Sequence, residues 1–275
     1  MVEAERGPRA LVVVPTYNER DGIAEVTRRL FTAAGDSVEL LVVDDASPDG
    51  TAELVRRLGR GPYPIHLIER PRKLGLGTAY VAGFRWGLQR GYWAIVEMDA
   101  DLSHNPDDVP RLLDALGDAD VAIGSRYAPG GRIPNWGLWR RALSFGGNAY
   151  ARRWLALEVR DSTSGFRAYR SSVLAAVDLA RVTSEGYAFQ IEMTRRARLA
   201  GARLVEVPIT FVDRTQGASK MSRGIVVEAL ASVTFWGLHD WYLRRRARRR
   251  PDDAPLGRGP SGPESSSRPT GSELC

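Results

Sequence analysis

The stretch Ala-Leu-Val-Val-Val-Pro-Thr-Tyr-Asn-Glu at residues 10–19 runs from apolar, largely β-branched side chains into a polar turn. A second stretch in the same order, Val-Glu-Leu-Leu-Val-Val-Asp-Asp-Ala-Ser-Pro-Asp-Gly-Thr, occupies residues 38–51. Short apolar runs that end at turns are typical of strands buried on both faces. Such strands belong to parallel sheets that helices cover on both sides. The two stretches therefore predict an α/β fold.

The alternation of strand and helix continues to about residue 125. Further apolar runs lie at residues 65–68, 93–96 and 121–123, and helical spacing separates the runs at residues 21–33, 51–58, 78–89 and 107–116. This order predicts a mainly parallel central sheet flanked by helices. We expect residues 10–125 to form a nucleotide-binding half.

Beyond residue 125 the regular alternation stops. A loop rich in glycine, proline and arginine at residues 128–137 precedes an expected helix at 139–156, a strand at 164–169, a helix at 187–200 and a strand at 203–211. We expect residues 126–222 to form an acceptor half. The catalytic domain would then span residues 10–222, after a flexible N-terminus at residues 1–9.

The C-terminal part combines an apolar segment with a basic run. Residues 225–238 carry one charge, Glu228, and are too few to cross a bilayer, which takes about 20 residues. Aromatic and basic side chains follow, namely Trp236, Trp241, Tyr242, Arg244, Arg245, Arg246, Arg248, Arg249 and Arg250. Residues 223–250 therefore predict an amphipathic helix and a basic run at a membrane surface, with rings at headgroup depth and arginines facing anionic lipid. A core helix with a solvated basic end is the alternative.

The amino-acid composition limits the expected cellular location and the expected binding partners. The net charge of +6 equals the six arginines of that run, and no stacking aromatics alternate with them, so we expect no nucleic-acid partner. The single cysteine, Cys275, excludes an intrachain disulfide, and no signal-peptide pattern precedes residue 10. We therefore expect a cytoplasmic protein, peripheral on the cytoplasmic face of a membrane. Residues 251–275 are polar and rich in proline, glycine and serine, which predicts disorder.

Acidic side chains follow three of the expected strands. They are Glu19 after the first, Asp44 and Asp45 after the second, and Asp99 and Asp101 after the fourth. Ligands of open α/β sheets bind at this edge, and clustered acids need a cation or hydrogen-bond donors. Asp99 and Asp101 are two apart in an extended segment and could bind Mg2+ or Mn2+ together, leaving positions for phosphate oxygens. The alternative for these aspartates is that they only cap turns.

Several stretches together resemble a known enzyme family. They are residues 14–19, 43–51, 73–80, 98–104, 124–127, 163–167, 186–193 and 211–214. With them the chain resembles family 2 glycosyltransferases of the GT-A fold over about residues 10–245, and most closely the dolichol-phosphate and polyprenol-phosphate mannosyltransferases. The first two stretches and Asp-Ala-Asp occur across the superfamily. The stretches at residues 99–104, 187–193 and 211–214 are specific to a much smaller group of enzymes.

The resemblance implies a set of site residues. It implies that the nucleoside is held by Pro15, Tyr17, Glu19, Val42 and Asp44. Asp99 and Asp101 would bind the metal, with the Ala100 backbone beside them. Arg214 and Lys220 would close over the diphosphate, and Arg126, Arg140 and Ser144 match positions that hold the acceptor phosphate, with Asp161 and Ser164 bordering that site. Some members carry glutamine where Ser103 stands here, which leaves the third metal ligand open.

The implied reaction transfers mannose from GDP-mannose to a polyprenyl monophosphate, with inversion at the sugar. A phosphate oxygen is already anionic and needs no general base, and none of the three histidines, His66, His104 and His239, lies in an evident base motif. A UDP-glucose-dependent polyprenyl-phosphate glucosyltransferase, a transferase with a sugar or protein acceptor, and a non-catalytic nucleotide-binding or nucleic-acid-binding module are the alternatives. Some related enzymes carry C-terminal transmembrane helices or a fused partner domain, and this chain shows neither pattern, so we expect its membrane attachment to be weak or to be assisted by a membrane-protein partner.

Overall fold

A computed structural model of the 275-residue chain describes residues 9–212 and 223–248. The expected disordered tail at residues 251–275 and nearly all of the expected flexible N-terminus lie outside these residues. So do Arg214 and Lys220, the two cations expected to close over a diphosphate.

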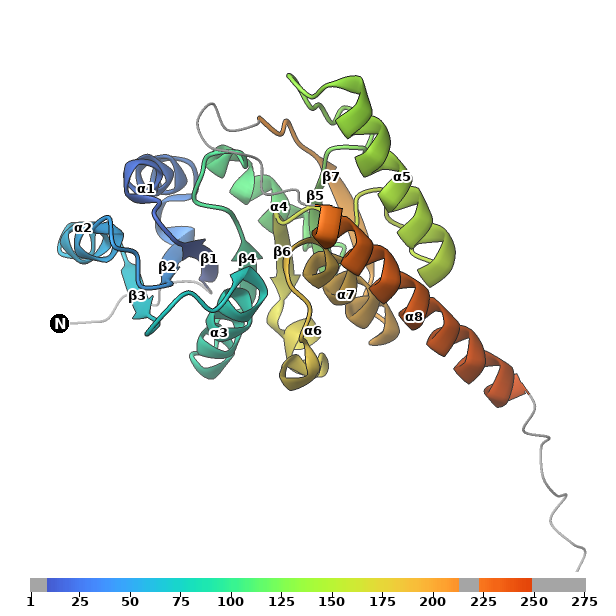
Figure 1. The fold of residues 1–275 in the computed structure, drawn as a ribbon. Helices are drawn as coiled ribbons and strands as arrows, with labels where there is room; N and C mark the ends of the chain where they lie inside the picture. Colours follow the sequence, from blue (N-terminus) through green and yellow to red (C-terminus); the bar gives the residue numbers. More distant parts are fainter. Residues whose placement is uncertain (1–8, 213–222, 249–275) are drawn as a thin grey trace, which may run out of the picture.

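One sheet of seven strands forms the centre of the molecule, in the order β3-β2-β1-β4-β6-β5-β7 (Figure 1). The strands are β1 (Ala10–Thr16), β2 (Val38–Asp44), β3 (Ile65–Glu69), β4 (Ala94–Glu97), β5 (Val121–Ser125), β6 (Arg167–Arg170) and β7 (Leu204–Pro208). Every pairing is parallel except those of β6, which runs antiparallel to both β4 and β5. The predicted α/β fold with a mainly parallel sheet is confirmed.

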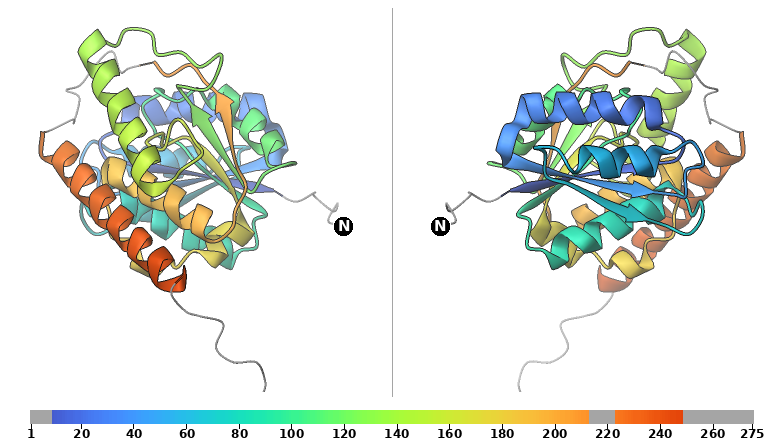
Figure 2. Two further views of the ribbon diagram at one scale, coloured as in Figure 1. Left: turned by 90° about the vertical axis from the view of Figure 1, so that its right-hand side faces the viewer. Right: turned by 90° about the vertical axis from the view of Figure 1, so that its left-hand side faces the viewer.

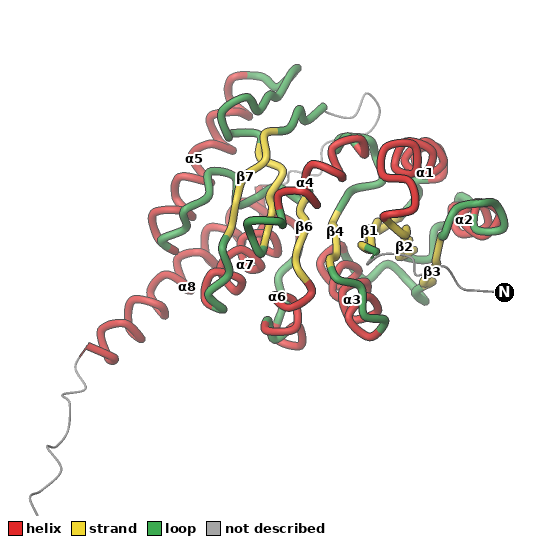
Figure 3. The backbone as a smooth tube through the Cα atoms, turned by 180° about the vertical axis from the view of Figure 1, so that it is seen from behind, coloured by secondary structure: helices red, strands yellow, loops and turns green. Residues whose placement is uncertain are grey.

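Helices cover both faces of this sheet, as the view from behind shows (Figure 3). Those on one face are α1 (Arg20–Ala34), α2 (Thr51–Leu58) and α4 (Val109–Ala115), and those on the other are α3 (Leu76–Gln89), α6 (Ser171–Ala176) and α7 (Gly186–Leu199). Successive side chains of β1 point to opposite faces of the sheet. Val12 and Val14 therefore pack with α1, whereas Leu11 and Val13 pack with α3. The buried runs that predicted the strands thus fill two apolar layers.

Two long helices lie side by side on one flank, α5 (Leu138–Leu155) and α8 (Arg223–Arg248) (Figure 2). A hydrogen bond of 2.8 Å joins the hydroxyls of Tyr150 and Thr234, and Val233 is buried against the sheet side. The predicted interfacial position of Trp236 is wrong, because this side chain is half-buried and packs against the core. Among the described residues, no helix is long and apolar enough to cross a membrane.

Some expected elements have different bounds. The expected helix at 107–116 is a short 3-10 turn, Pro106–Asp108, followed by α4, and the apolar segment 225–238 lies in the first part of the longer α8. The expected strand at 164–169 starts only at Arg167, because Ser164 Oγ turns back to bond the Gly124 carbonyl at 2.6 Å. The expected halves 10–125 and 126–222 share one continuous sheet, so their division stays a prediction.

The strand order opens a site at one edge of the sheet. β1 has β2 on one side and β4 on the other, with Thr16 opposite Asp44 and Val13 opposite Glu97. The chain therefore leaves β2 and β4 on opposite sides of the turn that follows β1. Such a reversal of strand order is where open α/β sheets bind ligands.

A buried arginine joins β6 to α7. The Arg167 side chain is fully buried, and it donates to the carbonyls of Ser164 at 2.6 Å and Ser162 at 2.7 Å. It also donates to the Gln190 carbonyl at 2.9 Å and the Thr194 hydroxyl at 2.8 Å. One guanidinium thus satisfies four acceptors in two segments, which fixes α7 against residues 162–164.

Replacing this guanidinium should destabilise the protein strongly. Arg167→Met keeps the length of the side chain but removes the donors of four buried acceptors, which should lower the free energy of unfolding by about 3 kcal/mol or more. Urea unfolding followed by circular dichroism measures the loss. Arg57→Met, at an exposed position of α2, is the control and should unfold like the unaltered protein. Equal unfolding midpoints for both variants would contradict the role given to Arg167.

Candidate active site

Asp99 follows β4 at the edge where the strand order reverses. Its side chain is 30% exposed, so the carboxylate reaches the surface although neighbouring groups hold it. The Tyr80 hydroxyl donates to Asp99 Oδ1 at 3.2 Å, and the Asp99 backbone N–H donates to His104 Nδ1 at 3.3 Å. His104 is buried and stacks on Phe166 with 5.1 Å between ring centroids. Helix α3 and the turn after β4 together fix the orientation of Asp99.

Asp101 is half-buried in the same turn. Its Oδ1 accepts a 2.9 Å hydrogen bond from the Ser103 backbone N–H, and Leu102 between them has a left-handed φ of 61°. Asp101 therefore caps this turn, as one of the two sequence interpretations expected. This hydrogen bond involves one oxygen of the Asp101 carboxylate, and a carboxylate that binds a metal ion can also accept such a bond. Capping the turn is therefore compatible with cation binding.

The aspartate pair fits a cation that shares its ligands with a phosphate. Among the described residues, no three His, Cys, Asp or Glu side chains gather closely enough to enclose a metal ion. Mg2+ needs no such cage, because it commonly binds one or two carboxylates and takes its other oxygens from water and substrate phosphate. Two carboxylates on one turn, both reaching the surface, match this donor set.

The floor beside Asp99 is made by residues that the sequence analysis missed. A Cβ added at Gly165 would lie 4.0 Å from Asp99 Oδ2 and 3.4 Å from Gln190 Nε2. Gln190 in turn donates to Glu97 Oε2 at 2.9 Å. Burial raises the pKa of Glu97 to about 7, and the positive charge of Arg167 opposes this rise. Only membership of the recognised stretch at residues 186–193 could have pointed to Gln190.

Asp44 lies behind the loop after β2. It is buried, and its oxygens accept hydrogen bonds from the Thr16 hydroxyl at 2.7 Å, the Ser47 N–H at 2.8 Å and the Ser47 hydroxyl at 2.6 Å. These bonds shape the loop that faces the turn after β1. A direct contact between Asp44 and a nucleoside stays a prediction.

The other expected nucleoside residues have two different positions. Pro15 at the end of β1 and Tyr17 and Glu19 in the turn after it are half-buried, whereas Val42 is fully buried in an apolar layer and brings no side chain to this edge. Lys73 adds a cation that the sequence analysis missed, because its Nζ lies 4.0 Å from the centroid of the Tyr17 ring.

The loop that carries Lys73 is held by a buried ion pair. Arg70 Nε donates to Asp45 Oδ1, and Asp45 Oδ2 accepts from the backbone N–H groups of Leu74 at 3.0 Å and Gly75 at 3.2 Å. Arg70 also donates to the Gly75 carbonyl at 2.8 Å. Gly75 has a φ of 103°, which only glycine adopts without strain. Asp45 therefore has a structural task, and Arg70 is a partner that sequence alone did not reveal.

Arg126 and Asp161 form a second buried ion pair, at the end of β5. Arg126 Nε and Nη2 donate to the two Asp161 oxygens at 2.8 and 2.7 Å, and the Arg126 backbone N–H adds a third bond at 2.9 Å. Burial alone would lower the pKa of Arg126, but the Asp161 charge outweighs it and raises this pKa. Burial likewise opposes ionisation of Asp161, yet Arg126 holds the pKa of this carboxyl below its usual range. Both groups are therefore charged.

The three expected acceptor-phosphate residues lie close together. The guanidinium carbons of Arg126 and Arg140 lie 5.6 and 4.2 Å from the centroid of the Trp136 ring. Ser144 is one helical turn beyond Arg140 on α5, and its carbonyl accepts from Asn148 Nδ2 at 3.1 Å. Asn148 Nδ2 also contacts the Thr163 hydroxyl at 3.1 Å, and this hydroxyl accepts from Arg126. We call Arg126, Arg140 and Trp136 the basic wall.

An aromatic chain joins the basic wall to the aspartates. The Phe211 ring meets His104 edge-on at 5.5 Å and Trp136 edge-on at 5.9 Å between centroids. His104 contacts Asp99, and Trp136 lies under Arg140. We call Asp99 and Asp101 the acidic edge. The acidic edge and the basic wall are thus neighbouring parts of one site. Phe211 and Trp136 were not predicted, because they meet only in the folded chain.

Comparison with known proteins identifies the family. Residues 11–177, more than half of the chain, match the family described as Glycosyl transferase family 2. The undecaprenyl-phosphate mannosyltransferase of Micrococcus luteus is 50% identical over 240 residues, which cover 87% of this chain and 98% of that protein. The polyprenol monophosphomannose synthase of Mycolicibacterium smegmatis is 50% identical over 240 residues, with 86% and 90% covered.

Solved structures share the fold at low sequence identity. Glucosyl-3-phosphoglycerate synthase from Mycobacterium tuberculosis in complex with uridine-diphosphate has a TM-score of 0.61 and 19% identity, over 84% of this chain and 80% of that chain. The same enzyme with Mn2+, uridine-diphosphate-glucose and phosphoglyceric acid has a TM-score of 0.61 and 18% identity, over 84% and 80%. The chain belongs to glycosyl transferase family 2 and is a glycosyltransferase with the GT-A fold.

Proposed function

We propose that the protein transfers mannose from GDP-mannose to a polyprenyl monophosphate and forms polyprenyl phosphate mannose. The observation that carries the proposal is the contact, through Phe211, between an acidic edge suited to a metal-bound diphosphate and a basic wall suited to a second phosphate. The names of two relatives at 50% identity support the sugar and the lipid acceptor.

The reaction needs few groups from the protein. An acceptor phosphate oxygen would attack the anomeric carbon while the bond from that carbon to the GDP β-phosphate oxygen breaks, so the configuration inverts. The anionic nucleophile needs no base, and the site supplies none from histidine, because His104 is buried between Phe166 and Phe211. Mg2+ or Mn2+ bound by Asp99 and Asp101 would stabilise the negative charge of the departing diphosphate.

The flank beside the basic wall suits a lipid substrate. Leu138 and Trp139 at the start of α5 are 84% and 81% exposed, directly before Arg140, and Phe145 follows Ser144 with its ring exposed. On α8, Phe235, Leu238, Trp241 and Tyr242 are also exposed. We propose that this α5/α8 face lies on a membrane surface, which would place the basic wall at the depth of a lipid phosphate. A membrane-protein partner could strengthen this attachment.

Product analysis tests the function directly. The purified protein, Mg2+ and a short polyprenyl phosphate are incubated with either GDP-mannose or UDP-glucose. The mass of the lipid product is then measured by mass spectrometry. GDP-mannose should give a hexosyl lipid phosphate with the β configuration by NMR. A product from UDP-glucose alone would assign the donor to the alternative glucosyltransferase, and an α-linked product would exclude a single inverting step.

Loss of a metal-binding carboxylate should abolish most of the activity. Asp101→Ala should lower kcat by at least about a hundredfold, because a bound cation stabilises a departing diphosphate by several kcal/mol. Tyr80→Phe removes only the hydroxyl that orients Asp99 and should weaken metal affinity about tenfold, visible as a higher Mn2+ concentration at half-maximal activity. Full activity of the unaltered protein in a chelator would refute the metal assignment.

Arg140 should act on the acceptor and not on the donor. Arg140→Ala should lower kcat/KM for the polyprenyl phosphate about ten- to a hundredfold, the range for losing a charged hydrogen bond, while KM for GDP-mannose changes little. Arg141→Ala removes the same charge from the neighbouring, exposed position of α5 and serves as the control. An equal effect of both substitutions, or a main effect on the donor, would count against the assignment.

A further inference from the structure

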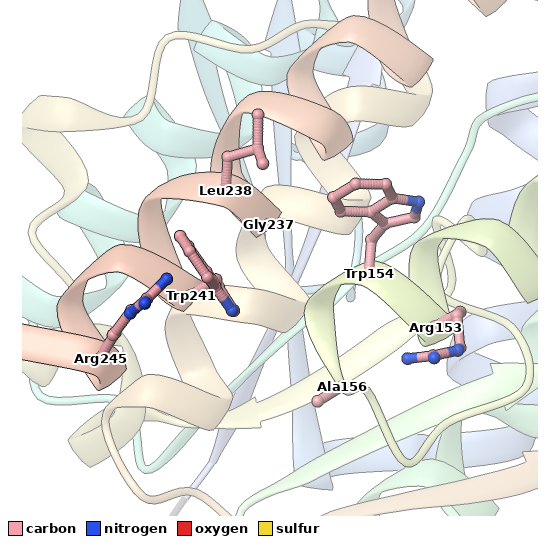
Figure 4. A pocket seen from close by; sticks show the side chains of 7 residues that line it. All are labelled: Arg153, Trp154, Ala156, Gly237, Leu238, Trp241 and Arg245. Atoms are coloured by element: carbon pink, nitrogen blue, oxygen red, sulfur yellow. The ribbon is translucent and has the colours of Figure 1, made fainter. Parts of the chain in front are cut away.

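A groove separates the end of α5 from the second half of α8 (Figure 4). Its volume is about 850 Å3, and its walls include Arg153, Trp154, Gly237, Leu238, Trp241 and Arg245. Sites for small molecules in proteins commonly have volumes of about 300–1,000 Å3. The groove therefore has room for a lipid headgroup together with part of an acyl chain.

Helix packing explains why the groove exists. The two helices close at Gly237, where an added Cβ would lie 2.8 Å from Cε3 of Trp154. Helix α5 then ends at Leu155, and Ala156 turns the chain away with a left-handed φ of 51°. Helix α8 continues to Arg248, so its last turns have no neighbour from α5. The groove occupies the space beside these turns of α8, beyond the end of α5.

The groove is apolar inside and positive at its rim. Trp154, Leu238 and Trp241 are each at least one-third exposed to it or to the surface beside it. Arg153 and Arg245 supply the charge, and the Arg245 guanidinium carbon lies 5.1 Å from the centroid of the Trp241 ring. Asp240 does not offset this charge, because it is buried and paired with Arg195 and Arg198 of α7. Tryptophan beside arginine is typical of the boundary between acyl chains and anionic headgroups.

We propose that this groove binds one anionic phospholipid of the bilayer, an inference that rests on the proposed membrane position of the α5/α8 face. The headgroup phosphate binds Arg245 beside Trp241, Arg153 adds positive charge at the other end of the groove, and the first part of an acyl chain packs on Trp154 and Leu238 (Figure 4). This site is distinct from the acceptor site, because Arg153 lies nine residues beyond Ser144 on α5, about 13 Å along the helix. The bound lipid fixes the depth and tilt of the basic wall at the membrane.

Vesicle flotation of the full chain tests the site. Phosphatidylcholine vesicles with and without phosphatidylglycerol are compared for the unaltered protein and for the variant Arg153→Gln/Arg245→Gln. The variant should partition about 30-fold more weakly onto the anionic vesicles, since two arginines near such a surface contribute about that factor. Arg57→Gln/Arg60→Gln removes two exposed charges at the opposite end of the sheet and should leave partitioning nearly unchanged.

Fluorescence shows whether a lipid occupies the groove. Brominated phosphatidylglycerol should quench tryptophan emission more than brominated phosphatidylcholine, and the variant Trp241→Phe should lose part of this quenching. Equal quenching by both lipids would overturn the proposal, as would unchanged flotation of the arginine variant. Unchanged flotation with altered sedimentation of the arginine variant would instead assign the groove to a second copy of the chain.

Activity in detergent separates this proposal from the proposed function. With a short, detergent-dispersed prenyl phosphate, the arginine variant should turn over as fast as the unaltered protein, because the groove takes no part in the reaction. Loss of this activity with vesicle binding retained would make the groove part of the acceptor site and would contradict the proposal. An inactive unaltered protein would count against the proposed function, whereas the lipid measurements would still decide the groove.

Discussion

The buried ion pair between Arg126 and Asp161 fixes the basic wall of the candidate site. Moving either charge out of water alone is costly, so each needs the other, and breaking such a pair typically costs about 3–5 kcal/mol. Asp161 precedes β6, the strand that runs against the direction of its neighbours, and Arg126 follows β5. Thr163 and Asn148 continue the hydrogen bonds from this pair to α5. The position of α5, and with it Arg140, depends on the pair.

Because of this pair, Arg126 and Arg140 have different roles in the basic wall. Arg126 directs two of its nitrogens at Asp161, so part of its charge is compensated within the protein. A phosphate would thus meet a guanidinium that is already rigid and would not have to order it. Arg140 shares the Trp136 ring with Arg126 but comes from the exposed start of α5, beside Leu138 and Trp139. Arg126 is therefore held rigidly, and Arg140 lies where a lipid substrate would arrive.

Much of the fold followed from local sequence patterns. Apolar runs such as residues 10–14 predict buried strands because their side chains must fill both faces, and strand ends place Asp99 and Asp101 at one edge by topology alone. Contacts between distant residues were beyond such reasoning. Arg70 with Asp45, Gln190 with Glu97, and Phe211 with Trp136 join segments far apart in sequence, and no local pattern marks them. Trp236 resembled its exposed neighbours Phe235 and Trp241, but the helix turns it inward.

His104, Phe211 and Trp136 join Asp99 to the basic wall, and we propose that the resulting single site binds two phosphate groups. A crystal structure of the protein with GDP, Mn2+ and a short prenyl phosphate tests it most directly. We expect Mn2+ on Asp99 and Asp101, and the prenyl phosphate on Arg126 and Arg140 on the other side of Phe211. A prenyl phosphate bound away from the basic wall, or Mn2+ bound without either aspartate, would contradict it.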